Sequence, residues 1–161
     1  MKIESITEKD IAKCLEIYNY YIKNSLATLE EDELSCEEFS RRVNRITASY
    51  PFLVAKEGQE VLGYAYLDVF NARSAYKITA DLSIYVKNGS THKNVGSALF
   101  AAIEELAKTR GIENIVSIIT DENIPSIAFH ERNGFIAAGE LQNVARKFGK
   151  TVGVKYYVKS L

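Results

Sequence analysis

The chain has 161 residues, of which 47% are hydrophobic and 25% charged, and its formal net charge is −1. A chain of this length and composition suits one globular domain with a buried core. The small net charge gives no electrostatic reason to expect nucleic acid or an anionic membrane as a partner. The sequence also lacks a run of ~18 apolar residues and a signal-peptide pattern, so we expect a cytoplasmic protein with no membrane partner.

The cysteines and histidines of the chain do not form a metal-binding pattern. Cys14 and Cys36 lie far apart, outside any ligand-type spacing, and the chain has only two histidines. Cys14 shares a helical stripe with Ile11, Leu15 and Ile22, which favours a place in the core. We therefore expect no metal site.

The first half of the chain predicts a strand, two helices and three more strands. Thr7 and Ser35 each begin a capping-box pattern, with an acidic residue three positions later. Apolar residues at helical spacing, and then runs of aromatic and β-branched residues, mark the elements. In chain order they are a strand at residues 2–6, a helix carrying the stripe 11–22, a helix from 35–38 to about 47, and strands at 52–55, 61–70 and 78–86.

The second half alternates helices and strands. Gly111 and Gly134 each follow the predicted end of a helix. The elements are a loop at 87–94, a helix at 95–110, a strand at 115–119, a helix at 125–133 and strands at 135–141 and 152–160. We expect a basic loop between the last two strands, with Arg146 and Lys147 on a solvated charged face. The order predicts one α/β domain over residues 1–161, with a central mixed sheet.

The most informative unit is the strand 78–86, its loop and the helix from Val95. A strand that leads through a polar loop into a helix N-terminus presents free N–H groups, and the helix dipole favours an anion such as pyrophosphate there. Gly96 lets a ligand approach the backbone, and Asn94 is the non-glycine residue best able to adopt positive φ. An ordinary loop is the alternative. Without a Walker lysine motif or a Gly-x-Gly-x-x-Gly pattern, ATP and dinucleotides are disfavoured.

A second unit reads Asn-x-x-Ser-x-x-x-His-x-x-x-Gly-Phe and spans residues 123–135. Alone, Asn123 and Ser126 are read most simply as helix caps. After the loop-helix unit, however, the pattern resembles the cofactor half of the GNAT acetyltransferase superfamily, and within it the phosphinothricin and methionine sulfoximine N-acetyltransferase branch. Further segments carry the resemblance, which runs from about residue 3 to 157: residues 17–19, 50–55, 63–66, 72–76, 83–86 and 147–149.

The resemblance implies a single-domain GNAT fold of the α/β (α+β) class, with a mixed, mostly antiparallel sheet flanked by helices. It also implies acetyl-CoA as cosubstrate, a small-molecule amine as acceptor and a homodimer. The chain departs from the family pattern in its phosphate loop, usually Gln/Arg-x-x-Gly-x-Gly/Ala, where it has Thr91 and Asn94. It has Asp81 where the branch usually has Glu, and Thr151 and Gly153 where the branch usually has Trp and Asp.

The resemblance also assigns cofactor residues. The strand gives backbone groups to the pantetheine arm, the loop covers the pyrophosphate, and two residues of the second unit lie along the arm. These are Ile84, Tyr85, Val86, His92, Lys93, Asn94, Val95, Gly96, Ser97, Asn123 and Ser126. His130 stands where many members have a Tyr near the sulfur, and a His there can protonate the thiolate. The alternative for His130 is a half-exposed helix residue beside Glu131.

Three residues are candidates for the acceptor side. Asp81 falls between apolar neighbours in a strand, and a carboxylate buried there has the raised pKa that suits a base near neutrality. Arg73 can bind a carboxylate or phosphinate bidentately, and Tyr76 can wall the acceptor pocket. The alternatives are an Asp81 on a polar face or paired with Lys77, a solvated Arg73 and a Tyr76 in the core.

We interpret the sequence as an N-acetyltransferase that acetylates the α-amine of a small amino-acid-like molecule. Acetylation of a peptide or protein amine is the second hypothesis, and it predicts an open acceptor groove. A non-catalytic acyl-CoA-binding module is the third.

Overall fold

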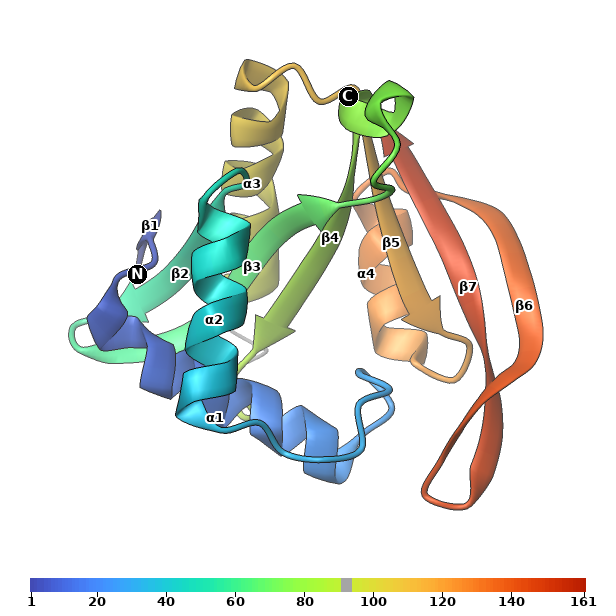
Figure 1. The fold of residues 1–161 in the computed structure, drawn as a ribbon, viewed down its shortest axis with the longest axis horizontal. Helices are drawn as coiled ribbons and strands as arrows, with labels where there is room; N and C mark the ends of the chain where they lie inside the picture. Colours follow the sequence, from blue (N-terminus) through green and yellow to red (C-terminus); the bar gives the residue numbers. More distant parts are fainter. Residues whose placement is uncertain (91–93) are drawn as a thin grey trace.

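The strands pair in the order β1-β2-β3-β4-β5-β7-β6 in one sheet of the computed structural model, which describes residues 1–90 and 94–161 (Figure 1). Every neighbouring pair is antiparallel except β4 and β5, which are parallel. The strands are β1 (Lys2–Ser5), β2 (Phe52–Glu57), β3 (Glu60–Val69), β4 (Thr79–Val86), β5 (Asn114–Thr120), β6 (Ile136–Lys147) and β7 (Lys150–Ser160). The mixed, mostly antiparallel sheet is therefore confirmed.

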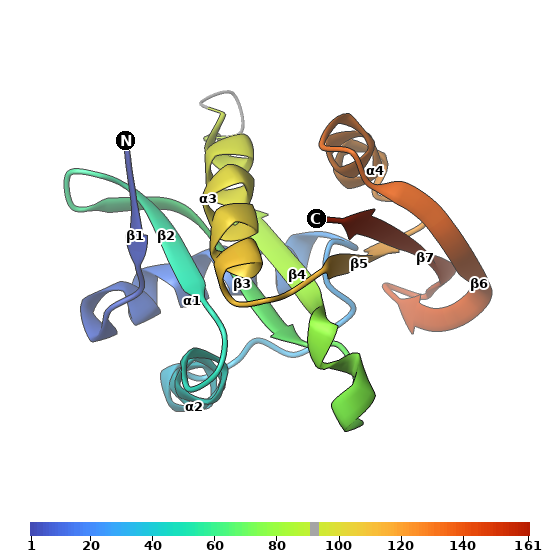
Figure 2. The same cartoon turned by 90° about the horizontal axis from the view of Figure 1, so that it is seen from above.

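Helices cover both faces of this sheet (Figure 2). They are α1 (Glu8–Asn24), α2 (Cys36–Thr47), α3 (Val95–Thr109) and α4 (Ile124–Arg132). The predicted order of helices and strands is confirmed, with boundaries within a few residues for most elements. The α2 capping box is formed as expected: Ser35 Oγ accepts from the Glu38 N–H at 3.2 Å, and the Glu38 carboxylate accepts from the Ser35 N–H at 2.9 Å.

The apolar residues form two cores, one on each face. Leu99 and Ile103 of α3 are fully buried against one face, and Cys14 and Ile22 of α1 against the other. The core position predicted for Cys14 is confirmed. Within the described residues, no helix is both long enough and apolar enough to cross a membrane.

The predicted basic loop near the C-terminus is wrong. Strands β6 and β7 form a long hairpin that pairs up to Lys147 and Lys150. Only Phe148 and Gly149 make the turn, with φ of 53° and 69°, as a tight hairpin turn requires. The charged side chains of this segment suggested a solvent-exposed loop. Strand pairing at the edge of a sheet uses backbone groups, however, and it does not require apolar side chains. The sequence also missed a short 3₁₀ helix, η1 (Ser74–Ile78), which delays the start of β4 to Thr79.

Candidate active site

The parallel strands β4 and β5 separate soon after they meet. They pair only from Thr79 to Asp81 on β4, and from Asn114 to Val116 on β5. Beyond these residues β4 has no strand partner on that side within the described part of the chain, and Figure 1 shows the two arrows diverging like a V. The closed end of the V lies at Asp81 and Val116, and its open end faces α3 and α4. Backbone groups of β4 thus have no strand partner along this side, where the Val86 carbonyl accepts a hydrogen bond from Tyr21 Oη instead.

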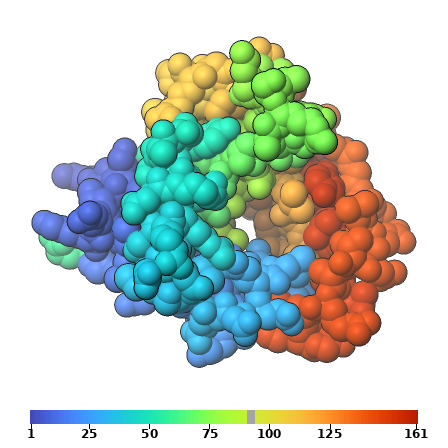
Figure 3. All heavy atoms as spheres, viewed as in Figure 1, coloured from blue at the N-terminus to red at the C-terminus, as the bar shows by residue number. Residues whose placement is uncertain are grey.

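A cavity of about 830 Å³ fills the V. Residues from both faces of the sheet line the cavity, because the gap between β4 and β5 connects the two faces. The lining includes Tyr21, Ser25, Leu26, Ala27, Leu82, Ser83, Ile84, Tyr85, Val86, Asn94, Gly96, Ser97, Ser117, Asn123, Ser126, Phe129, His130 and Phe148. The space-filling view shows a hollow on the α1–α2 side, between α2, the loop after α1 and the β6–β7 hairpin, with β4 and β5 at its floor (Figure 3). This volume is in the range of small-molecule and cofactor sites.

The N-terminus of α3 lies at the open end of the V. Asn94 is its N-cap and has φ of 55°, so the left-handed conformation expected of this residue is confirmed. Gly96 lies where an added Cβ would come 3.3 Å from the Phe129 ring, so this glycine lets α3 and α4 approach closely. Val95 is fully buried, and its neighbours Asn94, Gly96 and Ser97 line the cavity in its place. Of the predicted phosphate loop, His92 and Lys93 lie outside the described residues.

At the start of α4, Asn123 serves as a cap and also lines the cavity. Its Oδ1 accepts a hydrogen bond from the Ser126 N–H at 3.3 Å, so the capping alternative is confirmed for Asn123, whereas Ser126 lies inside α4 and is not the cap. The cap uses only the carbonyl half of the amide, and the NH₂ group remains a donor that a ligand can use. Ser126 lies beside Asn123 on the cavity wall. A structural role for Asn123 and a binding role are therefore compatible.

His130 is buried, with 6% of its surface exposed, so the alternative of a half-exposed histidine is wrong. Its ring packs edge-on against Phe129 and Phe135, with centroid distances of 5.4 and 4.9 Å. Nδ1 lies 2.7 Å from the Ser126 carbonyl oxygen, which can only accept, so Nδ1 carries the hydrogen. Burial lowers the pKa of His130. The neutral ring therefore presents Nε2 as an acceptor.

Asp81 is the last residue of β4 that pairs with β5, so it lies at the closed end of the V. Burial, and to a lesser extent the charge of Asp68, opposite on β3, raise the pKa of this carboxyl group to about 6. The raised pKa predicted for Asp81 is confirmed. The neighbouring charge that acts on it is Asp68 rather than Lys77. A carboxylate with this pKa is mostly ionised at pH 7 and still takes a proton readily.

Arg73 and Tyr76 do not line the cavity. Both are exposed, in and just before η1, which leads into the Asp81 end of β4. Tyr76 is 43% exposed and contacts only one ring in the described chain, that of Phe70 at 5.8 Å, so the alternative of a core position is wrong. The two residues thus lie outside the V, on the side of its closed end. Their part in binding an acceptor stays a prediction.

The architecture around this V can be compared with known proteins. Residues 3–153 match the acetyltransferase (GNAT) domain family. The chain belongs to the GNAT acetyltransferases. It is 30% identical to a phosphinothricin N-acetyltransferase of Streptomyces viridochromogenes, over 92% of this chain and 81% of that protein. A methionine sulfoximine and methionine sulfone acetyltransferase of Pseudomonas aeruginosa is also 30% identical, over 91% and 87% of the two chains.

Solved structures agree with this membership. A phosphinothricin acetyltransferase from Sinorhizobium meliloti in complex with AcCoA superposes with a TM-score of 0.95, at 29% identity over 99% of this chain and 88% of that one. A ribosomal-protein-alanine N-acetyltransferase from Brucella melitensis gives the same TM-score, at 31% identity over both whole chains. The protein is therefore an acyltransferase enzyme with the GNAT fold. In the described residues, no cluster of three or more His, Cys, Asp or Glu side chains is arranged to hold a metal ion.

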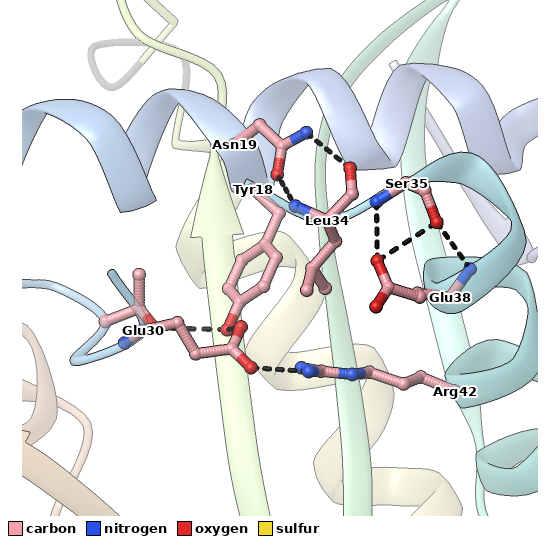
Figure 4. Close-up of polar contacts among 8 residues, drawn as sticks. Tyr18, Asn19, Glu30, Leu34, Ser35, Glu38 and Arg42 are labelled. Carbon is pink, nitrogen blue, oxygen red and sulfur yellow. Dashed lines mark hydrogen bonds and ion pairs between the residues drawn. The ribbon is translucent and has the colours of Figure 1, made fainter. Parts of the chain in front are cut away.

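A polar cluster that sequence reasoning missed fixes the loop between α1 and α2 of this acetyltransferase (Figure 4). Tyr18 Oη donates to the Glu30 carboxylate at 2.6 Å, and Arg42 bonds the other oxygen of Glu30 at 2.5 Å. Asn19 bonds both the N–H and the carbonyl of Leu34, each at 3.0 Å. The residues that hydrogen-bond this loop lie on two different helices, α1 and α2. No local sequence pattern therefore predicts the cluster.

Lys147 holds the same loop from the opposite side. It is 1% exposed, and its ammonium donates to the carbonyls of Ser25 and Thr28 at 2.8 Å each. The solvated position expected for Lys147 is therefore wrong. Thr120 of β5 adds a hydrogen bond to the Leu26 carbonyl at 2.6 Å. These contacts hold the segment from Ser25 to Ala27 in place where it lines the cavity.

Proposed function

We propose that this enzyme transfers the acetyl group of acetyl-CoA to the α-amine of a small amino-acid-like acceptor. One observation carries the proposal: the cavity runs from a helix N-terminus, an anion site, along β4 to Leu82, the residue next to Asp81, whose carboxyl group has a pKa of about 6. The first end suits the phosphates of an acyl-CoA, and the second suits a base for an amine. The names of the Streptomyces and Pseudomonas relatives support the acceptor class, and the AcCoA complex of the Sinorhizobium enzyme supports the donor.

The binding of acetyl-CoA would use the residues on either side of the V. The N–H groups that begin α3, at Asn94 to Ser97, face the pyrophosphate. The edge of β4 that faces the V, from Ile84 to Val86, offers backbone groups to the amides of the pantetheine arm, although the Val86 carbonyl already accepts a hydrogen bond from Tyr21 Oη. On the opposite wall, Asn123 offers its NH₂ group and Ser126 its hydroxyl.

N-acetyl transfer needs a neutral amine, whereas an α-amino group is largely protonated near pH 7. Asp81 accepts that proton, through a water molecule because its side chain is short. The neutral amine then forms the C–N bond as the C–S bond of the thioester breaks. After the C–N bond forms, the nitrogen still carries one proton in excess. Nε2 of His130, which is an acceptor in the neutral ring, takes up this proton and delivers it to the departing sulfur, so that CoA leaves as the thiol.

The acceptor class is tested with the purified enzyme, acetyl-CoA and a panel of acceptors, with release of the CoA thiol as the measurement. We expect release with free amino acids, sulfoximines or phosphinates. The structural likeness to the Brucella enzyme favours a second candidate, a peptide N-terminus, so the panel includes alanine-initiated peptides. Release with peptides alone would favour this second function, and no release with any acceptor would contradict both.

Replacing Arg73 with Ala tests how the acceptor is held. Loss of a charge-assisted pair to the acceptor carboxylate should raise the acceptor KM about tenfold or more, while the acetyl-CoA KM changes less than about twofold. Steady-state kinetics with each substrate varied in turn measures both constants. Lys77→Ala removes a neighbouring exposed cation and is the control, with wild-type constants expected. Equal changes in both KM values for Arg73→Ala would count against the assigned role.

We also propose that residues 1–161 form one acetyltransferase domain, which works as a cytoplasmic homodimer. Apolar side chains along the outer strand β6 support a second copy as partner: Ile136, Leu141 and Val144 are 68%, 49% and 52% exposed. An uncovered edge strand with such side chains is a natural pairing surface. Light scattering should give twice the 18.0 kDa mass of one chain, and a mass of one chain would contradict the dimer.

A further inference from the structure

Ser117 carries a buried hydroxyl group that lacks a partner in the described structure. The residue is 2% exposed, and no hydrogen bond to its Oγ is formed by the described residues. Most buried hydroxyls are hydrogen-bonded, because leaving one unpaired costs about 1–3 kcal/mol. The unpaired hydroxyl therefore needs an explanation. Ser117 lines the large cavity, so a ligand in the cavity can supply the missing partner.

The neighbours of Ser117 in the sheet do not supply a partner. Ser117 shares its face of β5 with Ile115 and Ile119, whose side chains belong to the apolar core. Across the β5–β7 ladder it pairs with Tyr157, whose hydroxyl instead donates to Glu131 at 3.1 Å. The cavity is the remaining direction from which a polar group can reach Oγ.

Ser117 also has a particular place along the cavity. It directly follows Val116, the last β5 residue paired with β4, and so lies at the closed end of the V. Asp81 pairs with Val116, so these two residues point to the same face of the sheet, the α1–α2 face. Successive residues of a strand point to opposite faces, so Ser117 belongs to the α3–α4 face. An acyl-CoA with its phosphates at the α3 N-terminus extends its acyl end towards this closed end.

We propose that the Ser117 hydroxyl donates a hydrogen bond to the carbonyl oxygen of the bound acyl thioester, and so positions the reacting group. This inference rests on the proposed use of acetyl-CoA. A carbonyl oxygen is the acceptor to expect, because the sulfur is a much weaker one. The hydroxyl then holds the thioester from one face of the sheet while Asp81 acts from the other.

Ser117→Ala tests the assignment by calorimetric binding and thermal unfolding, with acetyl-CoA and CoA as probes. The dissociation constant for acetyl-CoA should rise about threefold to tenfold. The dissociation constant for CoA, which lacks the thioester carbonyl, should stay within about twofold of the wild-type value. Without ligand the variant should unfold at the same temperature or higher, because it no longer buries an unpaired hydroxyl. Ser160→Ala makes the same chemical change on an exposed part of β7 and should leave both dissociation constants unchanged.

Three other outcomes would overturn the proposal. Equal losses of affinity for acetyl-CoA and CoA would place the contact on the pantetheine arm instead. A lower unfolding temperature with unchanged affinities would give Ser117 a purely structural role. If the wild type binds acetyl-CoA and Ser117→Ala binds it equally well, the contact does not exist. A wild type that binds neither probe would instead contradict the proposed function itself, which separates the two failures.

Discussion

Asp81→Asn should lower kcat with a small acceptor by about 10²–10⁴-fold, the usual contribution of a general base. The amide keeps the size of the side chain but cannot accept the amine proton. The acetyl-CoA KM should change little, because Asp81 lies on the face of the sheet opposite Ser117, beyond the β4 edge that binds the arm. Asp32→Asn, in the loop after α1, is the matched control and should retain wild-type kcat. A kcat for Asp81→Asn above about a tenth of wild type would exclude Asp81 as the base.

The pKa of Asp81 sets the pH dependence that accompanies this loss. In the wild type, kcat should fall as the pH drops through about 6, where the carboxylate becomes protonated. Asp68→Asn removes the neighbouring charge that raises this pKa, so the acid limb should move to lower pH. An acid limb that stays in place in Asp68→Asn would show that another group controls it.

The raised pKa of Asp81 also affects the stability of the fold. A carboxyl group whose pKa is higher in the folded than in the unfolded chain destabilises the fold as the pH rises from about 4 to about 6. Above that window the charged Asp81 lowers the free energy of unfolding, so Asp81→Asn should be more stable than wild type by about 1–3 kcal/mol at pH 7.5. Below pH ~4 the difference should vanish. Urea unfolding at the two pH values measures both, and a less stable variant at pH 7.5 would contradict this account.

Local signals in the sequence were enough to predict the order of the major elements. Capping boxes and apolar stripes mark α1 and α2 because they depend on residues three or four positions apart. The same holds for Asn94, since its position before a helix and its residue type together favour positive φ. The pKa of Asp81 was predictable because the alternation of β4 already indicated burial.

The features that the sequence did not predict depend on contacts between distant segments. The V requires β4 and β5 to pair for three residues and then part, and neither strand alone carries that information. The Ser117 hydroxyl belongs to an apolar strand, where nothing local distinguishes a paired hydroxyl from an unpaired one. Lys147 was predicted in solvent because its charged neighbours suggested a loop. The carbonyls that it binds lie 122 and 119 residues earlier in the chain.

Lys147→Met should cost about 2–4 kcal/mol of unfolding free energy, the second large effect that the structure predicts. Methionine retains much of the buried stem but leaves the carbonyls of Ser25 and Thr28 without their donor. Each unpaired buried carbonyl costs about 1–3 kcal/mol, and loss of the desolvated ammonium offsets part of the sum. Arg146→Met changes the adjacent, exposed cation and should stay within about 0.5 kcal/mol of wild type. Urea unfolding of the two variants gives the comparison.

Lys147→Met should also loosen, in particular, the loop between α1 and α2 that Lys147 holds. This loop contains Glu30, Glu31 and Glu33, so a glutamate-specific protease reports its opening under native conditions. Cleavage there should be faster in Lys147→Met than in Arg146→Met. Because Ser25 to Ala27 line the cavity, the KM values of Lys147→Met should rise as well. Lys147→Arg keeps a cationic donor and should restore part of both properties. If the Met variant unfolds early but its loop resists cleavage and its KM values are unchanged, then Lys147 only supports the hairpin. The Tyr18–Glu30–Arg42 cluster and the Thr120 hydrogen bond then fix the cavity wall without it.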